Sequence, residues 1–197
     1  MSEPAPRQAL QQRVAAAILE GAATVFAARG EQASMNDVAA EAGVARATVY
    51  RYFPSRQALV NELAQAALAD ADARLAAARI GEVAPLEGIV RAVRALVDLG
   101  DPFVLITRER TRSDPERFER TITQPLSHVF ERGQADGDIR TDITSARLTE
   151  SLIGLIAGVL MTRPRPGKED MVATITGLFV DGARARGPRP LRTSPGQ

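Results

Sequence analysis

The stretch that decides the fold is residues 34–59, which read SMNDVAAEAGVARATVYRYFPSRQAL. Ser34 stands three residues before Asp37, the spacing of a capping box at the start of a helix, and Gly43 can supply the left-handed residue that ends this helix. A second short helix can follow from about Ala45 and must end before the proline, because the residue that precedes a proline is extended. The stretch therefore predicts two short helices joined by a glycine-containing turn.

Longer helical patterns flank this pair of helices. Upstream, apolar residues recur at three- and four-residue spacing from Leu10 to Phe26, which predicts a helix that stops at Gly30. Downstream, Ser55 can cap an alanine-rich helix that extends to about Arg79. Further helical patterns cover residues 86–99, 102–112, 115–133, 143–162 and 168–186.

The composition of the 197 residues favours an all-α protein, because alanine is abundant and only 4% of the residues are aromatic. The chain has no cysteine and a single histidine, His128, which excludes disulfides, thiolate chemistry and a histidine-based zinc site. We expect no catalytic residue, no metal and no cofactor. The longest apolar run, residues 152–161, is too short to span a membrane, and residues 1–6 do not resemble a signal peptide. These features predict a soluble, cytoplasmic protein.

Four segments are expected along the chain. The predicted organisation is a flexible arm at 1–7, a domain at 8–55 that contains the two short helices, a second helical domain at 56–186, and a disordered tail at 187–197.

The charge of the two short helices indicates double-stranded DNA as a partner. Residues 42–61 contain three arginines and no acid, although the whole chain has a net charge of only +1. Two short helices that pack against a longer first helix have the arrangement of a helix-turn-helix. In that motif the second short helix enters the major groove of DNA. Thr48, Tyr50 and Tyr52 add hydroxyls that can donate to phosphate oxygens.

The motifs in residues 34–59 resemble the DNA-binding signature of TetR/AcrR-family transcriptional regulators. The match combines Ala-Gly-Val, a Thr-x-Tyr-x-Tyr-Phe run and a Ser-basic pair, and it covers roughly residues 10–62. Beyond it, only the number of helices and the turn at 137–142 are similar. Ala45 departs from the Ser or Thr usual in the family, which should cost about 1 kcal/mol of helix capping and one phosphate contact.

The resemblance implies a role for each residue of the signature. Tyr50 and Tyr52 correspond to phosphate-contacting tyrosines, Thr48 and Arg46 face the groove, and Arg56 is a phosphate clamp that replaces the usual lysine. Arg46 is expected to read a base edge, because arginine can bond bidentately to guanine. Alternatively, Tyr52 packs inside the domain, and Arg51 is a solvated surface charge. The predicted DNA-binding residues are Ser34, Ala45, Arg46, Thr48, Tyr50, Arg51, Tyr52 and Arg56.

A homodimer is expected, because one recognition helix with a few arginines binds DNA too weakly at cellular salt. Gly154 and Gly158 are four residues apart and would let two helices approach closely. The alternative is that these glycines pack against a neighbouring helix of the same chain. The predicted interface residues are Gly154, Leu155, Gly158, Val159, Ile175, Leu178 and Phe179.

The resemblance also implies a cavity for a small, mostly apolar effector, which Pro125 would help to open by kinking its helix. His128 and Thr107 could add polar contacts, whereas the mixed charges of residues 108–120 indicate a solvated, salt-bridged surface. The alternative is a plain hydrophobic core. The predicted pocket residues are Val97, Phe103, Ile106, Phe118, Ile122, Leu126 and Phe130.

The predicted function is therefore that of a homodimeric transcriptional repressor, released from a palindromic operator when its effector moves the helix that starts near residue 55. The residues do not distinguish repression from activation. An enzyme is disfavoured, because no carboxylates form a recognisable catalytic pair and no glycine-rich phosphate loop follows a strand. A helical adaptor that binds only protein and an architectural DNA-binding protein without an effector are the alternatives.

Overall fold

The described part of the chain is entirely helical. The structure is a computed structural model and describes residues 6–110 and 114–185. The helices are α1 (Pro6–Arg29), α2 (Met35–Glu41), α3 (Arg46–Tyr52), α4 (Arg56–Ala78), α5 (Pro85–Val97), α6 (Asp101–Glu109), α7 (Pro115–Phe118), α8 (Gln124–Ala135), α9 (Ser145–Met161) and α10 (Lys168–Ala183), with a 3₁₀ turn η1 (Gly30–Gln32) and a π-helical turn η2 (Glu119–Thr123). Because α7, η2 and α8 are continuous, the described residues form nine helices and no strand, and the predicted all-α class is confirmed.

The first helix begins earlier than expected. Pro6 and the residue after it belong to α1 rather than to the predicted arm at 1–7. Proline suits the first position of a helix, because the N–H that it lacks would have no partner there. Residues 1–5 and the predicted tail at 187–197 lie outside the described residues.

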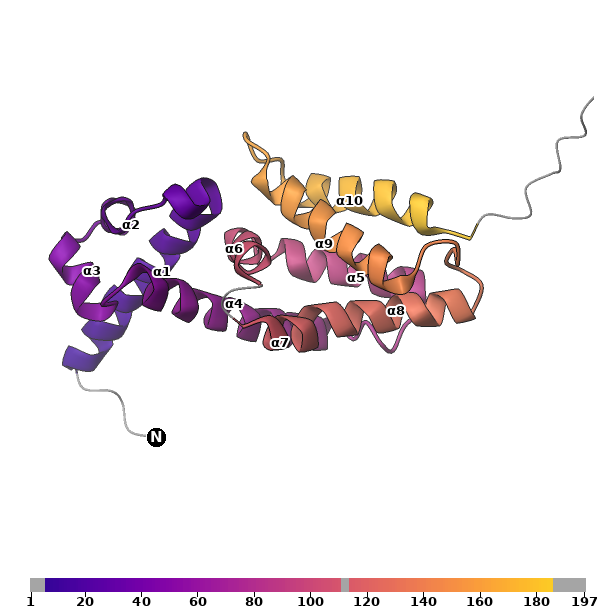
Figure 1. Cartoon of the computed structure of the whole chain (residues 1–197), viewed down its shortest axis with the longest axis horizontal. Helices are drawn as coiled ribbons and strands as arrows, with labels where there is room; N and C mark the ends of the chain where they lie inside the picture. The colour runs from indigo at the N-terminus through magenta and orange to yellow at the C-terminus, as the bar shows by residue number, and fades with distance from the viewer. Residues whose placement is uncertain (1–5, 111–113, 186–197) are drawn as a thin grey trace, which may run out of the picture.

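Two apolar clusters divide the molecule into an N-terminal unit and a helical bundle (Figure 1). The N-terminal cluster joins α1, α2 and α3 to the first turns of α4, where Leu59 and Leu63 are buried. The larger cluster lies among α4, α5, α6, α8, α9 and α10. Helix α6 packs against both α1 and α4, and its Leu105 is buried in the N-terminal cluster. Helices α4 and α6 therefore connect the two parts.

The turns of the N-terminal unit follow from local chemistry. Ser34 Oγ accepts from the Asp37 backbone N–H at 3.2 Å, and Asp37 Oδ2 accepts from the Ser34 N–H at 2.9 Å, which completes the predicted capping box. These hydrogen bonds from Ser34 hold the pKa of Asp37 below its usual value, and the charge of Arg29 adds to the effect. Gly43 has a φ of +64°, as expected of the residue that ends α2.

The interruption expected at Pro125 takes the form of the π-helical turn η2. A proline ring clashes with the carbonyl four residues before it, which here belongs to Thr121. The wider turn relieves this clash, because the Gln124 N–H bonds to the carbonyl of Glu119, five residues earlier. The helix thus continues through the proline.

Candidate nucleic-acid interface

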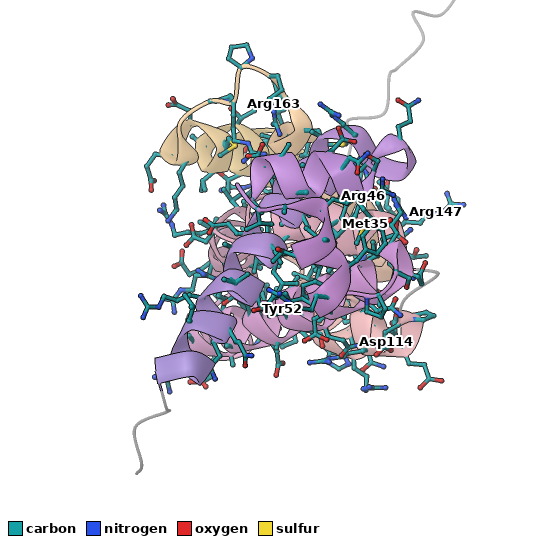
Figure 2. The ribbon with its side chains drawn as sticks, turned by 90° about the vertical axis from the view of Figure 1, so that its left-hand side faces the viewer. Met35, Arg46, Tyr52, Asp114, Arg147 and Arg163 are labelled. Atoms are coloured by element: carbon teal, nitrogen blue, oxygen red, sulfur yellow. The ribbon has the colours of Figure 1, made fainter. Side chains whose placement is uncertain are left out.

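Helix α3 is held against the N-terminal unit by one apolar face. Val49 is fully buried and Phe53, directly after the helix, is nearly so. Arg46 and Arg51 on the same helix are exposed, and Tyr50 is 39% exposed. Figure 2 looks onto this end of the molecule, where Arg46 is labelled. The outward face of α3 therefore consists of arginine and tyrosine side chains.

Both exposed arginines stack on neighbouring tyrosines. The Arg46 guanidinium carbon lies 5.3 Å from the centre of the Tyr50 ring, and that of Arg51 lies 5.4 Å from the centre of the Tyr52 ring. Such cation–π contacts restrict the guanidinium groups without using up their N–H donors. Tyr52 is half-buried. The arrangement leaves charged donors directed away from the domain.

The three small residues among the predicted DNA-binding residues lie at the start of a helix or are half-buried. Ser34 is exposed at the start of α2, but its hydroxyl is already engaged with Asp37, to whose Oδ2 it donates at 2.6 Å. Thr48 is half-buried on α3. Ala45 stands at the N-cap of α3, where no side chain caps the helix, as its substitution for Ser or Thr predicts.

Arg56 makes contacts inside the N-terminal unit. Its Nη2 donates to the Gly30 carbonyl at 3.0 Å, and its Nε donates to the Ala33 carbonyl at 3.3 Å. The guanidinium carbon is 4.8 Å from the centre of the Phe26 ring. Arg56 is thus half-buried and joins the start of α4 to the end of α1. In this structure Arg56 braces the N-terminal unit, because carbonyls of the turn after α1 accept its N–H groups, and its role as a phosphate clamp stays a prediction.

Arg108 is a second arginine at this junction, and the sequence did not single it out. It extends from α6, and its Nη1 donates to the carbonyls of Phe26 at 3.3 Å and Ala27 at 3.0 Å, in the last turns of α1. A cation at the C-terminal end of a helix satisfies free carbonyls and favours the helix dipole. Arg108 is nevertheless exposed, as predicted for the surface at 108–120, whereas Glu109 of the same stretch is buried. Sequence spacing could not reveal a partner so far away along the chain.

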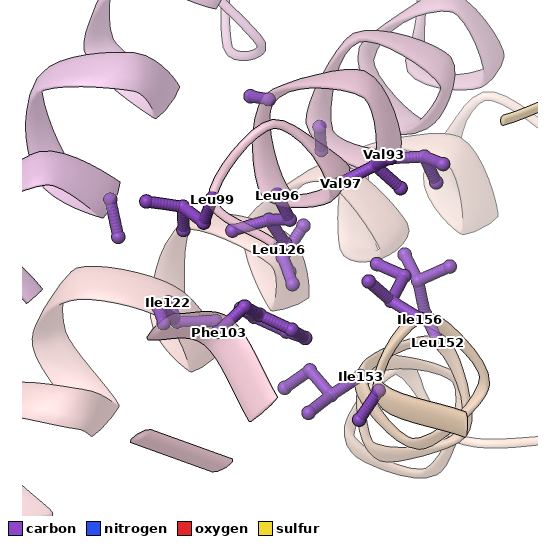
Figure 3. Packing of buried hydrophobic residues seen from close by; sticks show 14 of the residues in the cluster. Val93, Leu96, Val97, Leu99, Phe103, Ile122, Leu126, Leu152, Ile153 and Ile156 are labelled. Carbon is purple, nitrogen blue, oxygen red and sulfur yellow. The ribbon is translucent and has the colours of Figure 1, made fainter. Parts of the chain in front are cut away.

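The predicted effector residues meet in the core of the bundle, as Figure 3 shows for several of them. All seven are at most 4% exposed: Val97, Phe103, Ile106, Phe118, Ile122, Leu126 and Phe130. Several hollows lined by described residues lie elsewhere, at the surface between α4 and α5 and at the junction of α1, α4 and α6. His128 is exposed, and Thr107 donates to the Phe103 carbonyl at 2.8 Å, so neither presents a free polar group to this core.

The predicted dimer residues lie mostly on the outer face of α9 and α10. Gly154 and Gly158 are exposed, and a Cβ added at either would meet no described atom of this chain within 4 Å. Leu178 is 67% exposed, and Leu155, Val159 and Phe179 are half-buried. Ile175 is an exception, because it is fully buried in the core of its own chain and does not reach this face.

The described helices include none that is both long and apolar enough to cross a membrane. Among the same residues, no group of three or more histidine, aspartate or glutamate side chains gathers at a spacing that could hold a metal ion.

Known proteins with a similar sequence are bacterial regulators. Residues 18–63 match the family described as "Bacterial regulatory proteins, tetR family". The transcriptional repressor KstR2 of Rhodococcus jostii is 27% identical over 175 residues, which are 83% of this chain and 85% of that repressor. The transcriptional repressor LfrR of Mycolicibacterium smegmatis is 34% identical over 122 residues, which are 59% of this chain and 61% of that repressor.

A solved structure shares the fold. AibR in complex with isovaleryl coenzyme A and operator DNA superposes with a TM-score of 0.66 over 84% of this chain and 97% of that one, at 19% identity. These relatives are transcriptional regulators rather than enzymes, in agreement with the expectation of a non-catalytic protein. Residues 18–63 therefore carry a helix-turn-helix domain that matches the tetR family of bacterial regulatory proteins, and most of the chain is similar to DNA-binding transcriptional regulators.

Proposed function

We propose that the protein is a homodimeric repressor that binds a palindromic operator through α3 and leaves it when a small, mostly apolar effector enters the bundle. The observation that carries this proposal is the outward face of α3, with exposed Arg46, Tyr50 and Arg51 on a helix that contains no acid. Arginine and tyrosine donors suit phosphates and base edges in the major groove. Arg46, at the start of the helix, is the residue assigned to a base edge.

The glycine face of α9 and α10 supports the dimer. Gly154 and Gly158 have open space around them, so their small size is not required by packing within the described chain. Exposed Leu178 would be covered by a second copy. A twofold axis at this face pairs each helix with its own copy, and the two α3 helices can then enter successive major grooves, about 34 Å apart.

The core of the bundle supports the effector. Phe103, Ile122 and Leu126 belong to one apolar cluster that includes parts of α6, η2 and α8. The π-helical turn next to this cluster is a form of helix that often marks functional sites. An apolar ligand that separates these side chains would shift α6 and α4, both of which contact α1. A ligand that favours the shifted state about a hundredfold would supply about 2.7 kcal/mol, enough to release an operator.

Selection of bound DNA from a random-sequence pool by the full-length protein tests the DNA-binding part of this proposal. We expect an enriched site with two half-sites in inverted repeat and a Kd that rises steeply with salt. A helical adaptor that binds only protein would enrich no sequence. An architectural protein would bind DNA of any sequence with similar affinity and would ignore apolar ligands.

A further inference from the structure

A hollow of about 310 Å³ lies at the junction of α1, α4 and α6, outside the core that we assign to the effector. Its lining is mostly small and apolar, with Leu19 on α1, Ala66 on α4 and Leu105 on α6 among the contributors. None of the seven predicted effector residues lines it. The volume is at the lower end of the range for small-molecule sites, about 300 to 1,000 Å³.

Small side chains explain why the hollow exists. Where α1 and α4 face it they carry Ala23, Ala66 and Ala67, which leave unfilled a space that larger side chains would occupy. Helix α6 bounds it with Pro102 and Leu105. An apolar body of modest size can therefore contact all three helices at once.

The charged groups at the hollow are of one sign. Glu20 on α1 and Asp70 on α4 are its two charged lining residues, and no basic residue lines it. Glu20 is exposed and forms no ion pair within the described part of the chain, while Asp70 accepts from Arg74 at 3.0 Å. Because Arg74 offsets the charge of Asp70, Glu20 is the lining carboxylate that no described basic side chain neutralises.

We propose that this hollow is a binding site for small organic cations with an apolar body. The apolar part would rest among the alanine and leucine side chains, and the cationic group would lie between Glu20 and Asp70. Because the site touches both the N-terminal unit and the bundle, its occupant stabilises one arrangement of α1 relative to α4 and α6 and changes operator affinity. This second consequence rests on the proposed function, whereas binding itself does not.

Three probes that share one apolar body test the chemistry of the site. Phenylbutylamine is cationic at pH 7, phenylbutanol is neutral and phenylbutyrate is anionic, and each is titrated calorimetrically into the full-length protein. We expect the amine to bind about tenfold more tightly than the alcohol, because its ammonium group gains a charge-assisted contact with Glu20 and a second with Asp70, which it shares with Arg74. The anion should bind more weakly than the alcohol. Equal affinity for the three probes, or no binding of the amine, would overturn the proposal.

Substitutions locate the site. Ala66→Leu fills the hollow from an exposed helical position and should abolish amine binding, whereas Ala69→Leu, at an exposed position on α4 outside the lining, should leave it unchanged. Glu20→Gln and Asp70→Asn should each weaken amine binding about two- to fivefold. Amine binding that survives Ala66→Leu would place the ligand elsewhere and would refute the assignment.

Operator affinity is measured separately from amine binding. A saturating amine should change operator affinity at least about threefold in the wild type and should leave the affinity of the Ala66→Leu variant unchanged. Binding of the amine without any effect on operator affinity would overturn the regulatory part of the inference. If the wild type bound no operator at all, the proposed function would fail, while calorimetry would still decide whether the site exists.

Discussion

The two surfaces that we assign to macromolecular partners differ in their chemistry. The outer face of α3 presents arginine and tyrosine, with each exposed guanidinium stacked on a ring. The outer face of α9 and α10 presents glycine and leucine, with open space at Gly154 and Gly158. Charged donors suit DNA, which is a polyanion whose backbone shape varies little with sequence. Small apolar residues suit the close approach of a second copy of this chain. The two surfaces lie on different helices, α3 on one side and α9 with α10 on the other, so the residues of one do not take part in the other.

The largest expected effect is at the glycine face. Gly158→Leu places a branched side chain where two helices should meet, so the protein should become monomeric and its operator affinity should fall about 10²-fold or more, because the two recognition helices are no longer linked. Light scattering and an operator titration measure both quantities. Gly81→Leu, at an exposed glycine between α4 and α5, is the matched control and should remain dimeric. A dimeric Gly158→Leu variant would remove this face from the proposal.

Arg56 is the inward-facing arginine of the N-terminal unit, and its replacement tests how much this unit depends on it for stability. Arg56→Ala leaves the Ala33 carbonyl without its donor, removes one of the two donors to the Gly30 carbonyl and removes the contact with Phe26, so it should lower the free energy of unfolding by about 1 to 3 kcal/mol. Denaturant unfolding of the full chain measures this change. Unchanged stability with weakened DNA binding would instead support the phosphate clamp implied by the family resemblance.

Arg46 is the outward counterpart of Arg56. Arg46→Ala should cost about 1 to 3 kcal/mol of operator binding and relax the preference at one base pair, with little change in stability. Tyr50→Phe is the control, because losing a phosphate contact should weaken binding to all sequences alike. A base preference unchanged in the Arg46→Ala variant, measured by competition between operator variants, would contradict the assignment to a base edge.

A cap can be restored at the start of α3. Ala45→Ser supplies the side-chain acceptor that the helix lacks and should stabilise it by about 1 kcal/mol. Slower amide hydrogen exchange in α3 would report this gain. The Ala45→Gly variant is the comparison and should show a smaller gain, because glycine is accepted at N-caps without making the hydrogen bond. Unchanged hydrogen exchange in the serine variant would show that the missing cap does not limit the stability of α3.

The smallest effect concerns the pH dependence of the α2 cap. The pKa of Asp37 is lowered in the folded protein, chiefly by hydrogen bonds from Ser34, so its contribution to stability is present above the unfolded pKa of about 3.9. This contribution is lost as pH falls through the lower, folded pKa. The wild type should therefore be more stable than Asp37→Asn at pH 7, and the difference should shrink below about pH 4 in denaturant unfolding. A difference that does not vary with pH would contradict the cap as its source.

Local features of this protein can be predicted from its sequence alone. The capping box at Ser34, the turn at Gly43, the buried face of α3 at Val49 and the all-helical class follow from residues a few positions apart, because helix caps and helix periodicity are short-range properties. The family signature lies in the same stretch. These features were enough to identify the DNA-binding unit.

Whether a side chain points inward or outward depends on the tertiary structure when the groups that it contacts are distant in sequence. Arg56 and Arg46 look alike in the sequence, yet Arg56 turns inward to the end of α1 while Arg46 remains exposed. Ile175 shares a helical stripe with Leu178 but is buried within its own chain. Arg108 belongs to a charged stretch of the sequence, and its guanidinium donates to the Ala27 carbonyl in α1. Short-range patterns specify a helix and its apolar face, but the packing of helices from distant parts of the chain decides what covers that face and which carbonyls need a donor.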